Sequence, residues 1–466
     1  MADTPEKSEL SEAAKPTAEA AAETVAETAA ETAADKSAKP ADPKPKLWVT
    51  LGVWVLRIAV GALFIFSGTV KDIDLWGFVF KLEDYLAAWN MTQPRSLLLI
   101  LAMGISGYEL VFGFLLATGC YKRVAPWALT LSMAVMLPLT AYIAIANPVS
   151  DCGCFGDFWI LSNTATFIKN LFITAALILL IIYNPRVKQG LYRPAIQWLV
   201  VVIVSLYAIV VGLYGWNIQP MLDFRSFAPG TMIAPEDAGD EEDEPLPTFI
   251  YEKGGRQQEF TADSLPGDDW TFVRRVDAPS TAKPSAITVY DGDEDITAST
   301  IEPEGEQLLL IIPESRRADI SYTYYLNELN EKADSAGIPM VALLGASPRG
   351  NEFWKDISMA SYPCYSVEDT QLKEFSRGVM SLVLLRDGCV VSKSTLASLI
   401  GSDNDALNPM GAVRSLENID HSSEFRWITG FYAILLLLIY LFQGMLLGLR
   451  MLLKHALRKM GKVSKQ

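Results

Sequence analysis

Histidine is nearly absent from this sequence, which has only His421 and His455 among its 466 residues. Many transition-metal centres depend on histidine ligands, so a histidine-based metal site is not expected. The chain also lacks a basic stretch interleaved with aromatic residues outside the flanks of its apolar segments, and its net charge is −15. This excess of acidic residues argues against binding to nucleic acid.

Large apolar side chains are almost missing from residues 1–45, which consist mainly of Ala, Glu, Thr, Lys and Pro. A segment of this composition cannot bury enough apolar surface to offset the entropy that it would lose on ordering. We therefore predict a disordered cytoplasmic tail over residues 1–45. The segment also lacks the apolar core of a cleaved signal peptide. Its Ala/Glu run at 19–34 leaves a partner-binding helix open as an alternative.

Long apolar stretches characterise much of the remaining chain. Hydrophobic residues make up 50% of the sequence and charged residues 20%, which predicts membrane-spanning and water-exposed domains in one protein. Six stretches approach the roughly 20 residues that cross the hydrocarbon core of a bilayer. They are residues 47–70, 97–118, 124–146, 164–183, 195–216 and 427–449.

Clusters of lysine and arginine predict how the chain is oriented in the membrane. They lie beside the ends of the apolar stretches, at Lys44 and Lys46, Lys122 and Arg123, Arg186 to Arg193, and Arg450 to Lys465. Such clusters favour the cytoplasmic side, and all of them fall on one side if both termini are cytoplasmic. The prediction is a multi-pass plasma-membrane protein with residues 73–94, the 151–157 loop and residues 217–426 outside.

Two ionisable residues inside the apolar stretches stand out, Arg57 and Glu109. Counting from the cytoplasmic ends of two antiparallel spans places both at a depth of about 15 Å. An unpaired charge at that depth is costly, so we predict an intramembrane ion pair between these two side chains. Two roles for the pair stay open: a structural salt bridge that sets helix register, and a part in proton or ligand handling.

The most distinctive motif is the polar loop Asp151-Cys-Gly-Cys-Phe-Gly-Asp157 between two apolar stretches. Cysteines at i and i+2 can bring their Cα atoms into the disulfide range of about 4.4–6.8 Å, and Gly153 eases the tight turn. A ring this small is strained and readily exchanged. The flanking aspartates should raise the pKa of the thiols and weaken them as nucleophiles. Thiol exchange at Cys152 and Cys154, a structural disulfide, and two unpaired thiols are the three interpretations.

These residues belong to a wider pattern in the first four apolar stretches and their loops. The pattern comprises Arg57, Gly61, Phe64, Ser67, Gly68, Lys71, the 77–85 loop, Glu109, Gly113 and the Cys-Gly-Cys-Phe-Gly loop. It resembles the DoxX-like family, and more narrowly the branch related to the methylamine-utilisation protein MauE. The resemblance implies a four-helix bundle over residues 46–185 in a bacterial inner membrane. It also implies maturation of partner proteins by periplasmic thiol chemistry at Cys152 and Cys154, with a quinone as the candidate electron acceptor.

The region between the fifth and sixth apolar stretches reads as two parts. Residues 217–304 are predicted to form an acidic linker and a β-rich periplasmic segment. Residues 305–400 alternate apolar strands with amphipathic helices and close with an Asp-Gly hairpin, an order that resembles the thioredoxin-like fold. The Cys-x-x-Cys of that fold is missing from 313–318, and Val379-Met380 replaces its cis-proline. We therefore predict a degenerate module that binds a partner without transferring electrons itself.

Cys364 and Cys389 lie in or beside predicted strands of this module. A disulfide between them is one interpretation, and isolated buried thiols are the other, because free cysteine is common in protein cores. The predicted fold class is a membrane α-helical bundle, with a DoxX-like four-helix core plus two further transmembrane helices, joined to an extracytoplasmic α/β thioredoxin-like domain. The predicted function is thiol–disulfide chemistry for exported proteins, with a periplasmic thioredoxin-like protein or an exported client as partner. The alternative is a non-enzymatic membrane scaffold or chaperone.

Overall fold

Six helices of the described chain are long and apolar enough to cross a membrane, which confirms the predicted number of spans. The computed structural model describes residues 46–146, 152–187, 190–233, 248–253, 256–261, 270–276, 287–402 and 409–463, so the predicted tail, the acidic run near residue 240 and Asp151 lie outside it. The six helices are α2 (Leu47–Ile73), α4 (Arg95–Thr118), α5 (Val124–Ala146), α6 (Asn163–Tyr183), α7 (Gln197–Asn217) and α14 (His421–Val463).

Glycines allow α2 and α4 to pack with their backbones in close contact. A Cβ atom on Gly68 would lie 2.5 Å from the Ser106 carbonyl oxygen, and one on Gly61 would lie 2.7 Å from the Gly113 carbonyl oxygen. Small residues at such crossings favour helix association in membranes by allowing close packing. The hydrophobic effect does not drive this association, because lipid tails are as apolar as the helix surfaces. These contacts set the register between α2 and α4.

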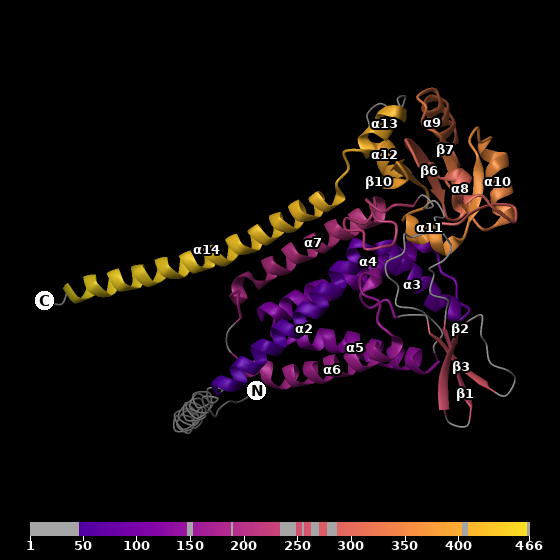
Figure 1. Ribbon diagram of the computed structural model, residues 1–466. Coiled ribbons are helices and arrows are strands. Elements are labelled where there is room, and N and C mark those ends of the chain that lie inside the picture. The colour runs from indigo at the N-terminus through magenta and orange to yellow at the C-terminus, as the bar shows by residue number, and fades with distance from the viewer. Residues whose placement is uncertain are drawn as a thin grey trace, which may run out of the picture. The chain divides into compact units, whose positions relative to one another are not determined.

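Helix α14 is much longer than the apolar stretch that predicted it. It runs for 43 residues and packs along α7, where the Tyr207 and Thr429 hydroxyl oxygens lie 3.0 Å apart (Figure 1). The polar residues before 427 and the basic residues after 449 contain no proline, so the helical hydrogen bonds continue past the apolar core at both ends. Hydropathy marks only the part of such a helix that prefers lipid.

The short helix α3 (Leu75–Ala88) follows α2 almost directly, and Asp74 caps its N-terminus by accepting a hydrogen bond from the Gly77 backbone N–H. Its apolar side chains Leu75 and Val79 are fully buried in a cluster with residues of α4. The mixture of aromatic and charged residues in this segment predicts an amphipathic element at the outer membrane interface. The structure shows a helix with one face packed against the bundle.

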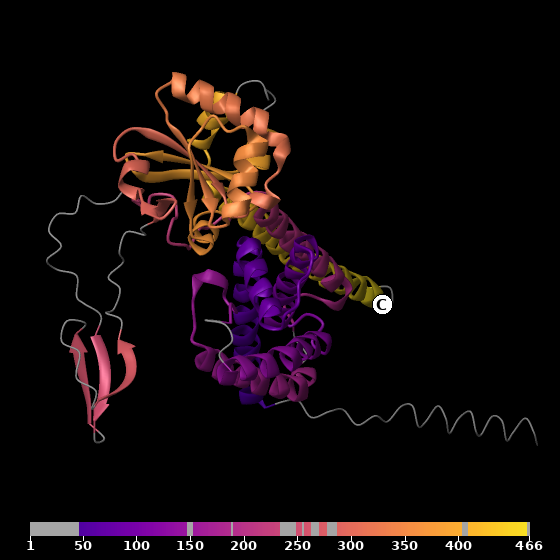
Figure 2. The same cartoon turned by 90° about the vertical axis from the view of Figure 1, so that its right-hand side faces the viewer.

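The second folded part is an α/β domain around a seven-stranded mixed sheet, with strand order β10-β9-β6-β7-β8-β4-β5. β6, β7 and β8 are parallel, and the remaining pairs are antiparallel. The strands are β4 (Val289–Asp291), β5 (Glu294–Asp295), β6 (Glu306–Ile312), β7 (Met340–Gly345), β8 (Cys364–Val367), β9 (Ser381–Arg386) and β10 (Cys389–Thr395). The helices are α8 (Thr297–Thr300), α9 (Thr323–Ser335), α10 (Pro348–Ser358), α11 (Asp369–Phe375), α12 (Leu396–Ser402) and α13 (Pro409–Leu416), seen around the sheet in Figure 2.

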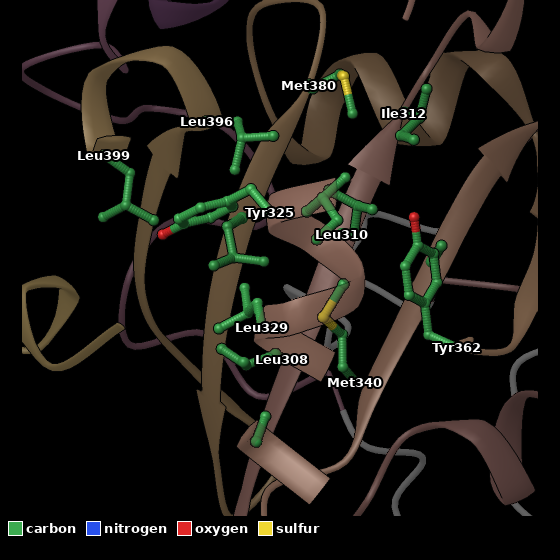
Figure 3. Packing of buried hydrophobic residues seen from close by; sticks show 14 of the residues in the cluster. Leu308, Leu310, Ile312, Tyr325, Leu329, Met340, Tyr362, Met380, Leu396 and Leu399 are labelled. Atoms are coloured by element: carbon green, nitrogen blue, oxygen red, sulfur yellow. The ribbon is translucent and has the colours of Figure 1, made fainter. Parts of the chain in front are cut away.

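Both faces of this sheet are buried. Leu308 and Leu310 of β6 point to the cluster that contains Tyr325 and Leu329 of α9, as Figure 3 shows, whereas the alternate residue Leu309 points to a second cluster on the opposite face. A strand covered on both sides reads as a continuous apolar run, which is how the sequence predicted β6 and β7. The predicted α/β character of this region is confirmed.

The order of the strands separates the two cysteines of the α/β domain. Cys364 lies on β8 and Cys389 begins β10, with β7, β6 and β9 between them. Four strand spacings of about 4.8 Å put these strands roughly 19 Å apart, far beyond the Cα separation of about 7 Å that a disulfide spans. The disulfide considered from the sequence does not form in this fold.

A separate three-stranded antiparallel sheet precedes the α/β domain, with the order β2-β1-β3. Its strands are β1 (Thr248–Lys253), β2 (Arg256–Thr261) and β3 (Thr271–Val276). All three lie within the segment that was predicted to be β-rich. The register between Ile250 and Tyr251 of β1 shifts against β3, which marks a bulge.

Candidate functional site

The Cys-Gly-Cys loop holds its two thiols in contact. Cys152 Sγ and Cys154 Sγ lie 3.0 Å apart, and both cysteines are free. This separation is about 1 Å longer than a disulfide bond, so oxidation requires only a small movement. Gly153 between them has a φ of +62°, in the left-handed region that favours glycine. The sequence prediction that the glycine permits a tight turn agrees with this geometry.

Two helices of the bundle anchor the loop through its backbone carbonyls. The Tyr85 hydroxyl of α3 donates to the Cys152 carbonyl at 2.6 Å, and Ser67 Oγ of α2 lies 2.8 Å from the Cys154 carbonyl oxygen. A Cβ atom added to Gly153 would lie 3.0 Å from Lys81 Cγ. Helix α3 therefore packs directly against the loop.

Beneath the loop, a small cavity lies between α2, α4, α5 and α6. Its volume is about 30 Å³, enough for about one water molecule. The polar side chains that line it are Ser67, Lys71, Glu109, Ser132, Cys154, Lys169 and Asn170. The sulfur-bearing loop and the buried charges of the bundle thus share one space.

Glu109 forms its buried ion pair with Lys71. Lys71 Nζ lies 2.7 Å from Glu109 Oε2 and 2.9 Å from Oε1, and the two side chains are 1% and 5% exposed. Ser67 Oγ lies 2.7 Å from Glu109 Oε2, so the same hydroxyl contacts both the carboxylate and the loop. The spacing of Ser67 and Lys71, four residues apart and hence on one helix face, is the sequence signal that could have identified this cluster.

Arg57 and Glu109, which the sequence paired, are not brought together. Arg57 donates a hydrogen bond to Asn184 Oδ1, and its guanidinium lies 4.8 Å from the centroid of the Trp54 ring. Because Ser67 is ten residues beyond Arg57 on α2, Glu109 lies about 15 Å further along that helix. The pairing was predicted by counting residues from the helix ends. This count does not give the register of α2 against α4, in which the glycine contacts place Arg57 beside Gly119 at the end of α4.

The two thiols differ in their affinity for a proton. The hydrogen bond between them lowers the pKa of Cys154, and the nearby positive charges of Lys169 and Lys71 lower it further, against the opposing effect of burial. The same hydrogen bond and burial raise the pKa of Cys152. Cys154 is therefore the thiolate of the pair and Cys152 the protonated donor.

Positive charge around the loop opposes the effect that was predicted from its aspartates. Lys169 Nζ lies 4.1 Å from the centroid of the Phe155 ring, so this lysine reaches the loop from within α6. Asp157 Oδ2 lies 2.6 Å from Arg377 Nη2 of the α/β domain. Both flanking aspartates were predicted to weaken the thiols. Asp151 lies outside the described residues, and the pairing of Asp157 with Arg377 reduces the field of that carboxylate on a neighbouring thiol.

The loop, the ion pair and the cavity lie in one stretch of sequence that can be compared with known families. Residues 49–183 match the family model of the methylamine utilisation protein MauE. This MauE-like segment runs from α2 to α6 and includes both loop cysteines, Lys71 and Glu109. The predicted resemblance to MauE is confirmed, and the one to the wider DoxX-like family stays a prediction.

Two further comparisons complete the description. Residues 247–279, which include the three-stranded sheet, match a domain of unknown function (DUF8463). Comparison with curated proteins and with solved structures gives no match. The MauE-like segment and the six apolar helices together identify a multi-pass membrane protein.

Proposed function

We propose that this membrane protein supports the maturation of exported proteins by thiol–disulfide exchange at Cys152 and Cys154. The observation that carries the proposal is the 3.0 Å contact between two free thiols in a loop outside the candidate spans. The name of the MauE family suggests that the client belongs to methylamine utilisation. The basic clusters favour an inner-membrane topology with cytoplasmic termini and the loop on the periplasmic side, where exported clients fold.

The proposed reaction transfers two electrons and two protons. A client dithiol reduces the Cys152–Cys154 disulfide through a mixed disulfide, so that one client disulfide forms and the two loop thiols are released. The dithiol is then reoxidised by an acceptor that takes two electrons and two protons, for which a membrane quinone is the candidate. In the dithiol state Cys154 carries the thiolate, stabilised by the Cys152 thiol and the charge of Lys169.

For the α/β domain we propose docking without electron transfer. Its strands and helices follow the order that resembles a thioredoxin-like fold, but the segment after β6 has a turn of 3-10 helix at Ser315–Arg317 and no cysteine. Cys364 is buried on β8, and burial raises the pKa of its thiol to about 11, so it is a poor nucleophile at neutral pH. We propose that this domain presents a client or a periplasmic redox partner to the loop.

A non-enzymatic scaffold or chaperone is the second candidate, and the cavity supports it. A volume of about 30 Å³ cannot hold a quinone ring, so an electron acceptor must reach the thiols from another side or after the bundle opens. In a scaffold, the two cysteines would only stabilise the loop.

Thiol trapping in intact membranes separates the two candidates. A maleimide mass tag reports the redox state of Cys152 and Cys154 with and without a reductant, and a Cys154→Ser variant is examined for mixed disulfides by mass spectrometry. We expect the pair to cycle and the variant to capture a client. Cys120→Ser is the matched control, because this buried cysteine lies away from the loop. A redox state that never changes, together with normal function of the Cys152→Ser/Cys154→Ser variant, would refute exchange and favour the scaffold.

A further inference from the structure

A buried arginine links the α/β domain to the thiol loop. Arg377, in the turn between α11 and β9, has a side chain that is 3% exposed. Its Nη2 atom lies 2.6 Å from Asp157 Oδ2 of the loop and 2.6 Å from Asp74 Oδ2, and its Nε atom donates to Asp74 Oδ1 at 2.8 Å. One guanidinium thus bridges two carboxylates from separate parts of the membrane bundle.

The position of Arg377 is determined by contacts other than the one with Asp157. Its backbone N–H donates to Gln219 Oε1 at 3.1 Å, and Gln219 Nε2 donates to its carbonyl oxygen at 2.8 Å. Asp74, its second carboxylate partner, is held as the N-cap of α3. The guanidinium also donates to the Lys373 carbonyl and lies 5.4 Å from the centroid of the Phe80 ring. These contacts hold the arginine in place whether or not the loop is present. Asp157 of the loop therefore binds a guanidinium that is already positioned.

We propose that Arg377 is a positioning residue through which the α/β domain controls the reactivity of Cys154. By pairing with Asp157 it neutralises a carboxylate three residues from Cys154 in the chain and holds the loop against α3. When the domain moves away, the negative charge of Asp157 is no longer neutralised. This charge disfavours the thiolate form of Cys154 and so lowers its reactivity. The inference rests on the proposed thiol function and adds a means of regulating it by whatever binds the α/β domain.

The other charges around Cys154 come from the bundle and do not depend on Arg377. Lys71 and Glu109 face the loop from α2 and α4, and Lys169 faces it from α6. Lys81 lies beside Gly153 from α3. The Cys152 thiol, 3.0 Å from Cys154, and the Tyr85 hydroxyl, bonded to the Cys152 carbonyl, are further titratable groups beside it. Removing Arg377 leaves all of these groups present, so a change in thiol reactivity reports the exposed charge of Asp157.

The test is the pH dependence of Cys154 alkylation in the full-length protein, followed by mass spectrometry of the loop peptide. A carboxylate within about 8 Å of a thiol, at an effective dielectric constant between those of protein and water, shifts its titration by roughly one pH unit. Arg377→Gln should therefore raise the alkylation midpoint by about one unit and slow alkylation at neutral pH by up to about tenfold. Arg377→Gln/Asp157→Asn should return the midpoint close to that of the native protein.

Arg95→Gln is the matched control. It removes a second ion pair between the bundle and the α/β domain, in which Arg95 Nη2 lies 2.5 Å from Glu314 Oε1, but it leaves the charge on the loop unchanged. We expect the midpoint to stay at the native value. If this control shifts the midpoint as much as Arg377→Gln does, domain contact in general and not the Asp157 charge is responsible, and the proposal fails.

Two further outcomes would overturn the inference. One is an unshifted midpoint in folded Arg377→Gln; the other is a shift that Asp157→Asn does not reverse, which would indicate a structural role only. If Arg377→Gln does not fold, Asp157→Asn alone decides, because it keeps the Arg377 contact with Asp74: the midpoint should then fall, and a rise would refute the proposal. Alkylation needs no client or acceptor, so failure of the exchange function is detected separately, by the redox trapping described above.

Discussion

The buried pair of Lys71 and Glu109 allows a sharp test of how the membrane bundle is held together. Glu109→Gln removes the carboxylate and leaves the Lys71 ammonium, which is 1% exposed, with the Ser67 hydroxyl at 3.1 Å as its remaining partner in the cluster. Lys71→Met leaves the carboxylate with the same hydroxyl at 2.7 Å. Breaking a buried ion pair from either side costs about 3–5 kcal/mol, because an uncompensated charge stays in a medium of low dielectric constant.

Removing both charges together should cost far less than either single change. The variant Lys71→Met/Glu109→Gln leaves no buried charge at either position, so we expect it to recover most of the stability lost in the single variants. The measurement is thermal unfolding of detergent-solubilised full-length protein, followed by loss of the monodisperse species on size-exclusion chromatography. The coupling energy from this double-mutant cycle should be about 2–4 kcal/mol.

A charge exchange distinguishes this pair from the one that the sequence suggested. Lys71→Glu/Glu109→Lys should be more stable than either of its single variants, because the two charges still face each other. Arg57→Glu/Glu109→Arg should show no such recovery, since Arg57 lies beside Asn184 and Gly119. Recovery in the Arg57 exchange and none in the Lys71 exchange would refute the helix register described above.

Three further predictions concern packing and pH. Gly68→Ala should destabilise the bundle by about 1–3 kcal/mol in the same thermal assay, because its Cβ would lie 2.5 Å from a carbonyl oxygen of α4, whereas Gly104→Ala, with nothing within 4 Å, should be neutral. Leu310→Ala should cost the α/β domain about 2–5 kcal/mol, seen as faster proteolysis of that domain in the full chain, because the fully buried side chain leaves a cavity. Burial opposes the charged form of Asp74, but the charge and hydrogen bonds of Arg377 outweigh it and lower its pKa. The stabilisation from this pair is therefore present above the ordinary aspartate pKa of about 3.9 and is lost as the pH falls below it. Proteolysis of the full chain should increase between pH 5 and pH 3. A variant with Asp74→Asn should show a smaller change.

Local patterns in the sequence were enough to predict most of the elements and the place of the thiol pair. Apolar length identified the six spans, since the thickness of a bilayer sets the number of residues that a helix needs to cross it. Continuous apolar runs identified β6 and β7, which are covered on both faces. The cysteines of the loop are two residues apart, so their proximity is a property of the local chain. Each of these signals lies within a few neighbouring residues.

The contacts between distant residues were decided by the tertiary structure alone. The partner of Glu109 depends on the register of α2 against α4, which is set by where glycine backbones touch and not by the distance of a residue from its helix end. Strand order, which hydrophobic alternation does not specify, separates Cys364 from Cys389. Arg377 and Asp157 are 220 positions apart in the chain, and only the packing of the α/β domain on the bundle joins them. The residues next to an arginine in the sequence do not indicate whether it is buried or which distant carboxylate it pairs with, so local patterns could not predict this contact.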